Sequence, residues 1–143
     1  MEQAVARFVA QYHTLGVTGD PAYPKDVAAL ERHLGLPLPA AYRAYLLVAG
    51  NGPPPGMVGS DCTLRRVYTL REGAERLLSR GGSLLTLPTN AVVFWMHQGY
   101  QFAYFLAGSD GDPLVSYYHE RRAGSVVEES RLSEWLAAAA VHG

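Results

Sequence analysis

The sequence lacks the features that mark several classes of protein. It has one cysteine, Cys62, so no disulfide can form within the chain, and this suits a reducing compartment. Its 12 basic and 13 acidic residues give a formal net charge of −1, without the clustered basic charge of nucleic-acid-binding domains. No stretch approaches the roughly 20 apolar residues that span a bilayer. The N-terminus lacks the basic region and apolar run of a signal peptide. We expect a cytoplasmic protein that binds neither nucleic acid nor membrane.

The composition fits a globular domain. Hydrophobic residues make up 48% of the chain and charged residues 17%, which is the profile of a protein with a core and not of a disordered segment. A chain of 143 residues can bury such a core without disulfide or metal, and it leaves little room for a second domain. We therefore expect residues 1–143 to form a single domain.

The first third of the chain has three helical patterns. Near the N-terminus, apolar residues at i, i+3, i+4 and i+7 mark one helical face: Val5, Phe8, Val9 and Tyr12. A second helix is predicted to begin at Pro24, because a proline in the first turn loses no hydrogen bond. It should end at Gly35, since glycine suits the left-handed exit from a helix. A third helix is expected to begin at Pro39 and to end at Gly50.

The middle of the chain joins this helical half to a mostly β half. Residues Gly50–Gly59 contain three prolines, which lack backbone donors, and several glycines, so an exposed loop is predicted. Residues Leu64–Tyr68 indicate a short strand. Thr69 and Glu72 have the spacing of a capping box, which predicts a short helix that stops at Gly81-Gly82.

Residues 91–119 carry the pattern of a sheet. Ala91–Met96 is rich in β-branched and aromatic residues and predicts a first strand. A second strand is expected to place its alternating residues on one face: Tyr100, Phe102, Tyr104 and Leu106. Asp110 and Gly111 supply turn chemistry before a third strand over Leu114–His119. A closing helix is predicted to begin near Ser130. This order indicates an α+β fold, with N-terminal helices packed against a mostly antiparallel sheet and a closing C-terminal helix.

Two segments resemble the SMI1/KNR4 (SUKH) family. Asp26–Gly52 resembles the opening of these domains, with matching positions at Leu30-Glu31, Leu38-Pro39, Tyr42, Leu46 and Asn51-Gly52. Phe94–Glu120 resembles the sheet segment of bacterial members, with its His-Gln-Gly-Tyr-Gln-Phe stretch, Asp-rich turn and Tyr-rich strand. Including Ser133–Leu136 in the closing helix, the similarity covers about residues 23–136. One departure is Pro53, where the family pattern has a second glycine.

The resemblance implies a non-catalytic binding role. Many bacterial members look like immunity proteins that bind and block polymorphic toxins, so the expected partner is a cognate toxin domain and no cofactor is implied. Fungal relatives act as regulators of cell-wall synthesis and signalling. A regulatory or scaffold module that binds a normal cellular partner is therefore the alternative, because a fold does not fix its target.

Residues that could carry metal or nucleophilic chemistry are few. The histidines lack the short helical spacing of a zinc site, although folding could bring His97 and His119 together near strand ends. Asp110 and Asp112 are not followed by the further oxygen ligands of a calcium loop. Cys62 could pair with a histidine in a small hydrolase, but no local signature supports this alternative. We expect no metal site and no catalytic residue.

Surface recognition remains, and aromatic residues concentrate in the predicted sheet. Trp and Tyr are enriched at binding hot spots, although half the positions of an antiparallel strand usually face the core. The candidate partner-binding residues are Trp95, His97, Gln98, Tyr100, Gln101, Tyr118, Asp110 and Asp112. The loop Gly50–Asp61 is a second candidate, because its prolines reduce the entropy lost on binding. A rigid connector is the other interpretation of that loop.

Overall fold

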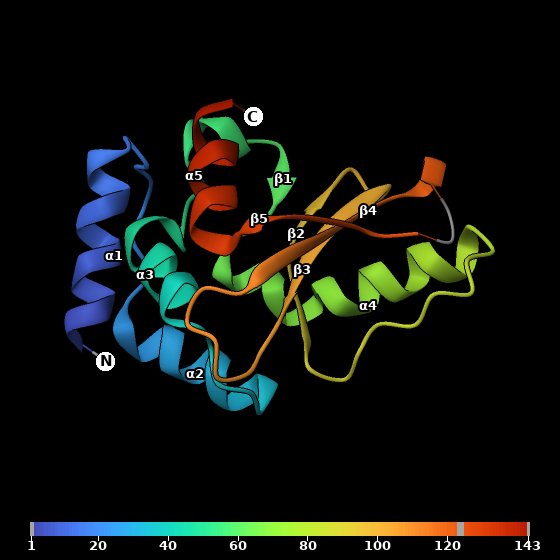
Figure 1. Cartoon of the computed structure of the whole chain (residues 1–143), viewed down its shortest axis with the longest axis horizontal. Helices are drawn as coiled ribbons and strands as arrows, with labels where there is room; N and C mark the ends of the chain where they lie inside the picture. Colours follow the sequence, from blue (N-terminus) through green and yellow to red (C-terminus); the bar gives the residue numbers. More distant parts are fainter. Residues whose placement is uncertain (1, 123–124, 143) are drawn as a thin grey trace.

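An antiparallel sheet runs through the middle of the computed structural model, which describes residues 2–122 and 125–142 (Figure 1). Within these residues the sheet has five strands that neighbour one another in chain order: β1 (Ser60–Asp61), β2 (Ala91–His97), β3 (Gln101–Leu106), β4 (Leu114–His119) and β5 (Val127–Arg131). Every adjacent pair is antiparallel. The predicted three-strand meander is confirmed, and it gains one further strand at each edge.

Helices cover both faces of this sheet. The described residues contain α1 (Glu2–Thr14), α2 (Pro24–Leu34), α3 (Ala40–Ala49), α4 (Leu64–Arg80) and α5 (Leu132–His142), with one-turn 3-10 helices η1 (Pro55–Met57) and η2 (Glu120–Arg122). In Figure 1, α1, α2 and α3 gather at one end of the molecule, and α4 extends along the sheet away from them. The fold is α+β as predicted. None of these described helices has both the length and the apolarity to cross a membrane.

Proline and glycine set the helix ends largely as the sequence predicts. Pro24 is the first residue of α2, and Gly35 ends that helix in the left-handed region with φ 66°. Pro39 lies one position before α3, where it has extended backbone angles, and it therefore caps that helix without entering it. Gly50 follows α3 and donates its backbone N–H to the carbonyl oxygen of Leu46.

The two faces of the sheet pack against different helices. One face, here called the α5 face, contacts α3 and α5, and the ring centroids of Phe94 and Trp135 lie 5.1 Å apart on it. The other, the α4 face, carries Met96 and its cross-strand neighbours Phe102 and Tyr118. The Phe102 and Tyr118 rings stack with centroids 5.1 Å apart. Both faces of the central strands are therefore covered, which explains the unbroken apolar run of β2.

The predicted strand at Leu64–Tyr68 is wrong. These residues form the first turns of α4, which begins after Thr63. The buried side chains of this helix recur at helical spacing: Leu64, Val67, Leu70, Ala74, Leu77 and Leu78. Thr69 lies inside the helix, and its hydroxyl donates to the carbonyl oxygen of Arg66 three residues earlier. The predicted capping box at Thr69 and Glu72 is therefore also wrong.

The closing helix begins slightly later than predicted, at Leu132. The residues before it, Val127–Arg131, form the edge strand β5, which pairs with β4 through Leu114↔Arg131 and Tyr117↔Val127. Val127, Glu128 and Arg131 of this edge strand are exposed, and such a strand does not need apolar alternation in its sequence. The predicted start near Ser130 extended the helix into this strand.

Candidate functional site

A row of half-buried rings crosses the α5 face at the end where β2 turns into β3. We call these residues the aromatic ridge: Trp135, Trp95, His97, Tyr100 and His119. Neighbouring ring centroids are 5.6 Å apart for Trp135 and Trp95, and 5.9 Å for Trp95 and His97, which stack nearly parallel. The next spacings are 5.9 Å from His97 to Tyr100 and 5.2 Å from Tyr100 to His119. Because each ring contacts the next, the ridge is a continuous aromatic surface.

A β-bulge places the two consecutive rings of β2 on the same side of the sheet. The pairing of β2 with β3 shifts register between Val93 and Trp95. Consecutive residues of a regular strand point to opposite faces, and a bulge breaks that alternation. Phe94 and Trp95 consequently both contact Trp135, with centroid distances of 5.1 Å and 5.6 Å. The buried Phe94 ring packs against α5 in the core, and the half-buried Trp95 ring belongs to the aromatic ridge.

The turn between β2 and β3 brings Tyr100 to the ridge. Gln98 and Gly99 both have left-handed backbone angles, with φ 51° and 76°. Tyr100 lies in this turn, outside β3, and its ring contacts residues of the α5 face. Phe102 and Tyr104, in contrast, are buried on the α4 face with ring centroids 6.2 Å apart. The prediction that Tyr100 shares a face with these two residues is wrong, because the strand alternation starts after the turn.

A hollow of about 290 Å³ lies beside Trp95. Three segments that are distant in the sequence line this aromatic groove: the loop before and including β1, strands β2 and β3, and helix α5. The lining residues are Gly56, Met57, Val58, Ser60, Trp95, His97, Gln101, Trp135 and Ala139. Val58 is 70% exposed and supplies an apolar rim. The structure therefore joins the two recognition regions that the sequence suggests separately, the sheet aromatics and the loop Gly50–Asp61.

The loop Gly50–Gly59 is exposed as predicted at Asn51, Pro55, Val58 and Gly59, but other residues of it are buried against α5. Met57 is 1% exposed, and the Tyr45 hydroxyl contacts its sulfur atom at 3.5 Å. Gly56 approaches the backbone of α5 so closely that a Cβ atom there would lie 2.4 Å from the carbonyl oxygens of Ala139 and Ala140. This contact requires glycine. The loop consequently forms a fixed wall of the groove, with Val58 projecting from it.

Polar contacts orient the side chains in the groove. Ser60 and His97 are cross-strand partners, and Ser60 Oγ lies 2.9 Å from His97 Nδ1. The Tyr117 hydroxyl donates a hydrogen bond to Gln101 Oε1. A serine and a histidine at this distance could be a nucleophile and its base. Among the described residues, however, no carboxylate bonds to His97 to orient it. The contact acts as a bond between β1 and β2.

Cys62 has the environment of a structural cysteine. Burial raises the pKa of its thiol to about 12, and the nearby charge of Asp61 adds to the shift. The Sγ atom lies 3.8 Å from the carbonyl oxygen of Ser60. A reactive cysteine needs a lowered pKa so that the thiolate forms near neutral pH. The Cys62 thiol is instead held in its neutral form.

The two histidines considered for a metal lie on either side of one residue. His97 and His119 are both cross-strand partners of Gln101, and the Tyr100 ring contacts both imidazoles. Over residues 2–122 and 125–142, no group of three or more His, Cys, Asp or Glu side chains is placed to hold a metal ion. Their geometry makes both histidines part of the aromatic ridge.

Tyr118 does not face solvent, and the expectation that it lines the exposed surface is wrong. It is 0% exposed on the α4 face, and its hydroxyl has no hydrogen-bond partner among the described residues. Alternation along β4 places Tyr117 on the α5 face, where its ring lies 6.3 Å from that of Trp95. Of the two adjacent tyrosines, Tyr117 and not Tyr118 therefore lies beside the aromatic ridge.

Asp110 and Asp112 lie at the opposite end of the β3–β4 hairpin from the ridge. The Asp112 carboxylate accepts hydrogen bonds from the Ser133 backbone N–H at 2.8 Å and from the Ser133 hydroxyl at 2.6 Å. Asp110 pairs with Arg131 at 3.0 Å and accepts the Asp112 backbone N–H. Asp112 thus stabilises the first turn of α5, and Asp110 holds Arg131 at the end of β5. The structure does not bring them to the groove, which Trp95, His97 and Gln101 line, or to the adjoining turn, which holds Gln98 and Tyr100.

The comparison with protein families agrees with the resemblance in the sequence. The model of the SMI1 / KNR4 family (SUKH-1) matches residues 21–138, which is most of the chain. This range agrees closely with the similarity found over about residues 23–136. No curated protein matches the chain.

Proposed function

The chain belongs to the SMI1/KNR4 family (SUKH-1), and we propose that it is an immunity protein that neutralises a cognate bacterial toxin domain by direct binding. The observation that carries this proposal is the convergence of three distant segments on one half-buried aromatic groove. We propose that residues 1–143 act as one domain and that binding takes place in the cytoplasm, a compartment that suits the single cysteine.

The aromatic ridge has the physical character of a binding hot spot. Trp and Tyr offer large contact areas, and their rings also make polar contacts at one end. Here the rings contact one another in a row, so their side-chain entropy is already reduced before a partner binds. An apolar side chain of the partner could enter the groove beside Trp95, and Val58 would enclose it from the rim.

Inhibition of the toxin would require no chemistry from this chain. The neutral Cys62 thiol and the cross-strand bond between Ser60 and His97 both have structural roles. A protein bound over an active site blocks access by volume alone. The formal net charge of −1 predicts only a modest dependence of association on salt.

The test is to purify the chain with the product of its neighbouring gene and to measure their association by calorimetry and the toxicity of that product in cells. We expect nanomolar binding that abolishes toxicity. Trp95→Ala and Tyr100→Ala should each weaken binding about 30-fold, which corresponds to a loss of about 2 kcal/mol at a hot spot. Binding without an effect on any toxic activity would instead favour a regulatory module of the same fold. Full affinity in both variants would exclude the groove as the binding surface.

A further inference from the structure

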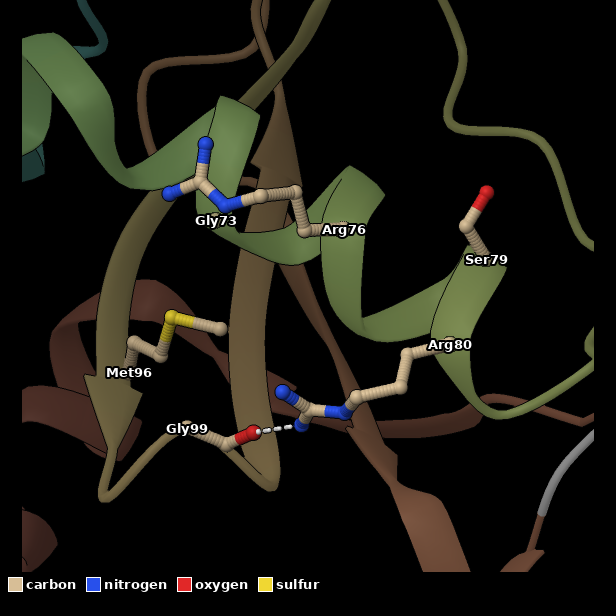
Figure 2. A pocket seen from close by; sticks show the side chains of 6 residues that line it. All are labelled: Gly73, Arg76, Ser79, Arg80, Met96 and Gly99. Atoms are coloured by element: carbon tan, nitrogen blue, oxygen red, sulfur yellow. Dashed lines mark hydrogen bonds between the residues drawn. The ribbon is translucent and has the colours of Figure 1, made fainter.

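A second hollow lies on the other side of the β2–β3 turn, on the α4 face. It has a volume of about 540 Å³ and is lined by Gly73, Arg76, Ser79, Arg80, Met96 and Gly99. Figure 2 shows that Arg76 and Arg80 extend from successive turns of α4 toward the side where Met96 lies, whereas Ser79 points away. We call it the arginine hollow. It combines two guanidinium groups with an apolar floor.

Gly73 allows this floor to form. A Cβ atom at position 73 would lie 3.2 Å from the Met96 sulfur atom, so the missing side chain is what lets Met96 approach the helix. Arg76 and Arg80 follow at positions three and seven residues further on, which places all three on one stripe of α4. The stripe faces the end of β2 and the Gln98–Gly99 turn.

The two guanidinium groups have little negative charge near them. The closest carboxylate to Arg76 is that of Glu72 at 4.0 Å, and both side chains of this pair are 72% exposed. Arg80 donates one hydrogen bond of 2.8 Å to the carbonyl oxygen of Gly99, and within the described residues it forms no other. Like charges four residues apart destabilise a helix. An anion in the hollow would relieve this repulsion and engage the remaining guanidinium donors.

We infer that the arginine hollow receives an Asp or Glu side chain of the protein partner. This inference rests on the proposed function, because the β2–β3 turn separates the hollow from the aromatic groove by only a few residues. A carboxylate on a short aliphatic stem matches two arginines above a methionine. A nucleic acid would require a basic surface, and the chain has a formal net charge of −1.

The test uses a defined probe, so it does not depend on the identity of the toxin. The peptide acetyl-Gly-Leu-Glu-Leu-Gly-amide is titrated into the ¹⁵N-labelled protein, and NMR follows the Gly73 and Gly99 amides and the Arg76 and Arg80 Nε–H signals. A second peptide with Gln in place of Glu, and inorganic phosphate at matched ionic strength, are the comparison ligands. We expect saturable shifts in the millimolar range with the Glu peptide, and about fivefold weaker binding of the Gln peptide.

The variants separate a local site from general charge. Arg76→Gln should weaken binding of the Glu peptide about fivefold, because it removes one of two charged donors. Arg65→Gln is the matched control, since Arg65 is an exposed arginine of the same helix outside the hollow and should leave binding unchanged. Trp95→Ala should likewise leave peptide binding unchanged.

Several results would overturn the inference: equal binding of the Glu and Gln peptides, no saturable shift, equal losses in Arg76→Gln and Arg65→Gln, or tighter binding of phosphate than of the Glu peptide. Each of these leaves the aromatic groove untouched as a binding surface. Conversely, failure of the toxin to bind the intact chain would contradict the proposed function and would not alter the peptide result at the arginine hollow. The two proposals therefore fail separately.

Discussion

Replacing Asp112 by alanine distinguishes a structural role from the partner-binding role that the sequence suggests for this residue. The substitution removes both acceptors that engage the first turn of α5, at 2.8 Å from the Ser133 backbone nitrogen and 2.6 Å from its hydroxyl oxygen. Loss of a helix cap costs about 1 kcal/mol, and loss of the charged hydroxyl bond costs about 1 kcal/mol more. Ser133 is buried, so water cannot easily replace the lost acceptors. We expect the free energy of unfolding to fall by about 2 kcal/mol.

Asp110→Ala is the matched control two residues away. The Asp110 carboxylate pairs with Arg131, and the two side chains are 56% and 49% exposed. Exposed pairs contribute about 0–1 kcal/mol, and water can replace the exposed bond from the Asp112 backbone N–H to Asp110, so this variant should lose less stability than Asp112→Ala. For a chain of 143 residues the entropy of unfolding is about 0.3 kcal/mol/K, so the expected loss at Asp112 lowers Tm by about 7 °C.

Urea unfolding followed by tryptophan fluorescence measures both variants, because Trp95 and Trp135 change environment on unfolding. The reasoning is refuted if Asp112→Ala costs less than about 0.5 kcal/mol, or if Asp110→Ala costs as much as Asp112→Ala. Partner affinity should be unchanged for both variants under conditions where they are folded. A loss of affinity of about tenfold or more in the folded state would instead support the partner-binding role of these aspartates.

Three further predictions concern the loop, the cysteine and the serine–histidine contact. Gly56→Ala should destabilise the chain by about 2 kcal/mol in urea unfolding, because its Cβ atom would meet two α5 carbonyl oxygens. The control variant Gly108→Ala places its Cβ atom in open space and should cost almost nothing. Equal losses of stability in the two variants would contradict the close packing of Gly56 against α5. Burial raises the pKa of the Cys62 thiol to about 12 in the folded state. The stability that the neutral thiol contributes to the folded state is therefore complete below the pKa of the unfolded thiol, and it is lost as pH rises towards the folded pKa. The Cys62 contribution to stability should therefore fall by up to about 1.4 kcal/mol per pH unit between roughly pH 9 and 12. Tyr12, Tyr42 and Tyr45, whose pKa values burial also raises, add to the loss in the upper part of this range. Cys62→Ala should reduce the slope measured by urea unfolding by the Cys62 contribution, and an unchanged slope would contradict burial of the thiol. Ser60→Ala should lower the free energy of unfolding by about 1 kcal/mol, because it removes the bond to His97, and it should still neutralise the toxin. A variant that binds the toxin but no longer neutralises it would instead favour a hydrolase.

Local patterns predict the elements of this fold where one residue decides the backbone geometry. Pro24 and Gly35 bound α2 as predicted, because each acts through its own dihedral preference. The strands over Ala91–His97 and Leu114–His119 follow from β-branched and aromatic content. Over the five residues Leu64–Tyr68, the spacing of apolar residues also fits a strand. The helix becomes evident only from the buried residues that recur at helical spacing along the whole of α4.

The candidate site depends on geometry that no local pattern contains. The aromatic content of the sheet identifies Trp95, His97, Tyr100 and Gln101 as candidates, and all four lie on the α5 face. The contribution of Trp135 and Val58 requires the tertiary packing of α5 and the loop, which brings the middle of the chain against its C-terminal helix.

The alternation of side chains along β4 places Tyr117 and Tyr118 on opposite faces of the sheet. It does not show which of the two tyrosines lies on the α4 face and which on the α5 face. That choice is made by the pairing Ala103↔Tyr117 and by the helices that cover each face. The sequence therefore suggests the region of the candidate site, but it does not show that Tyr118 lies on the covered face.

The most direct test of the aromatic groove as the binding surface compares two exposed apolar residues. Val58, 70% exposed, forms the rim of the groove, and Leu84, 97% exposed, lies outside it. Neither side chain is buried, so Val58→Asp and Leu84→Asp should both fold. Calorimetry with the toxin domain should show that Val58→Asp weakens binding about 30-fold or more and that Leu84→Asp binds like the wild type. Equal affinities for the two variants, or a loss confined to Leu84→Asp, would contradict the assignment of the groove as the partner-binding surface.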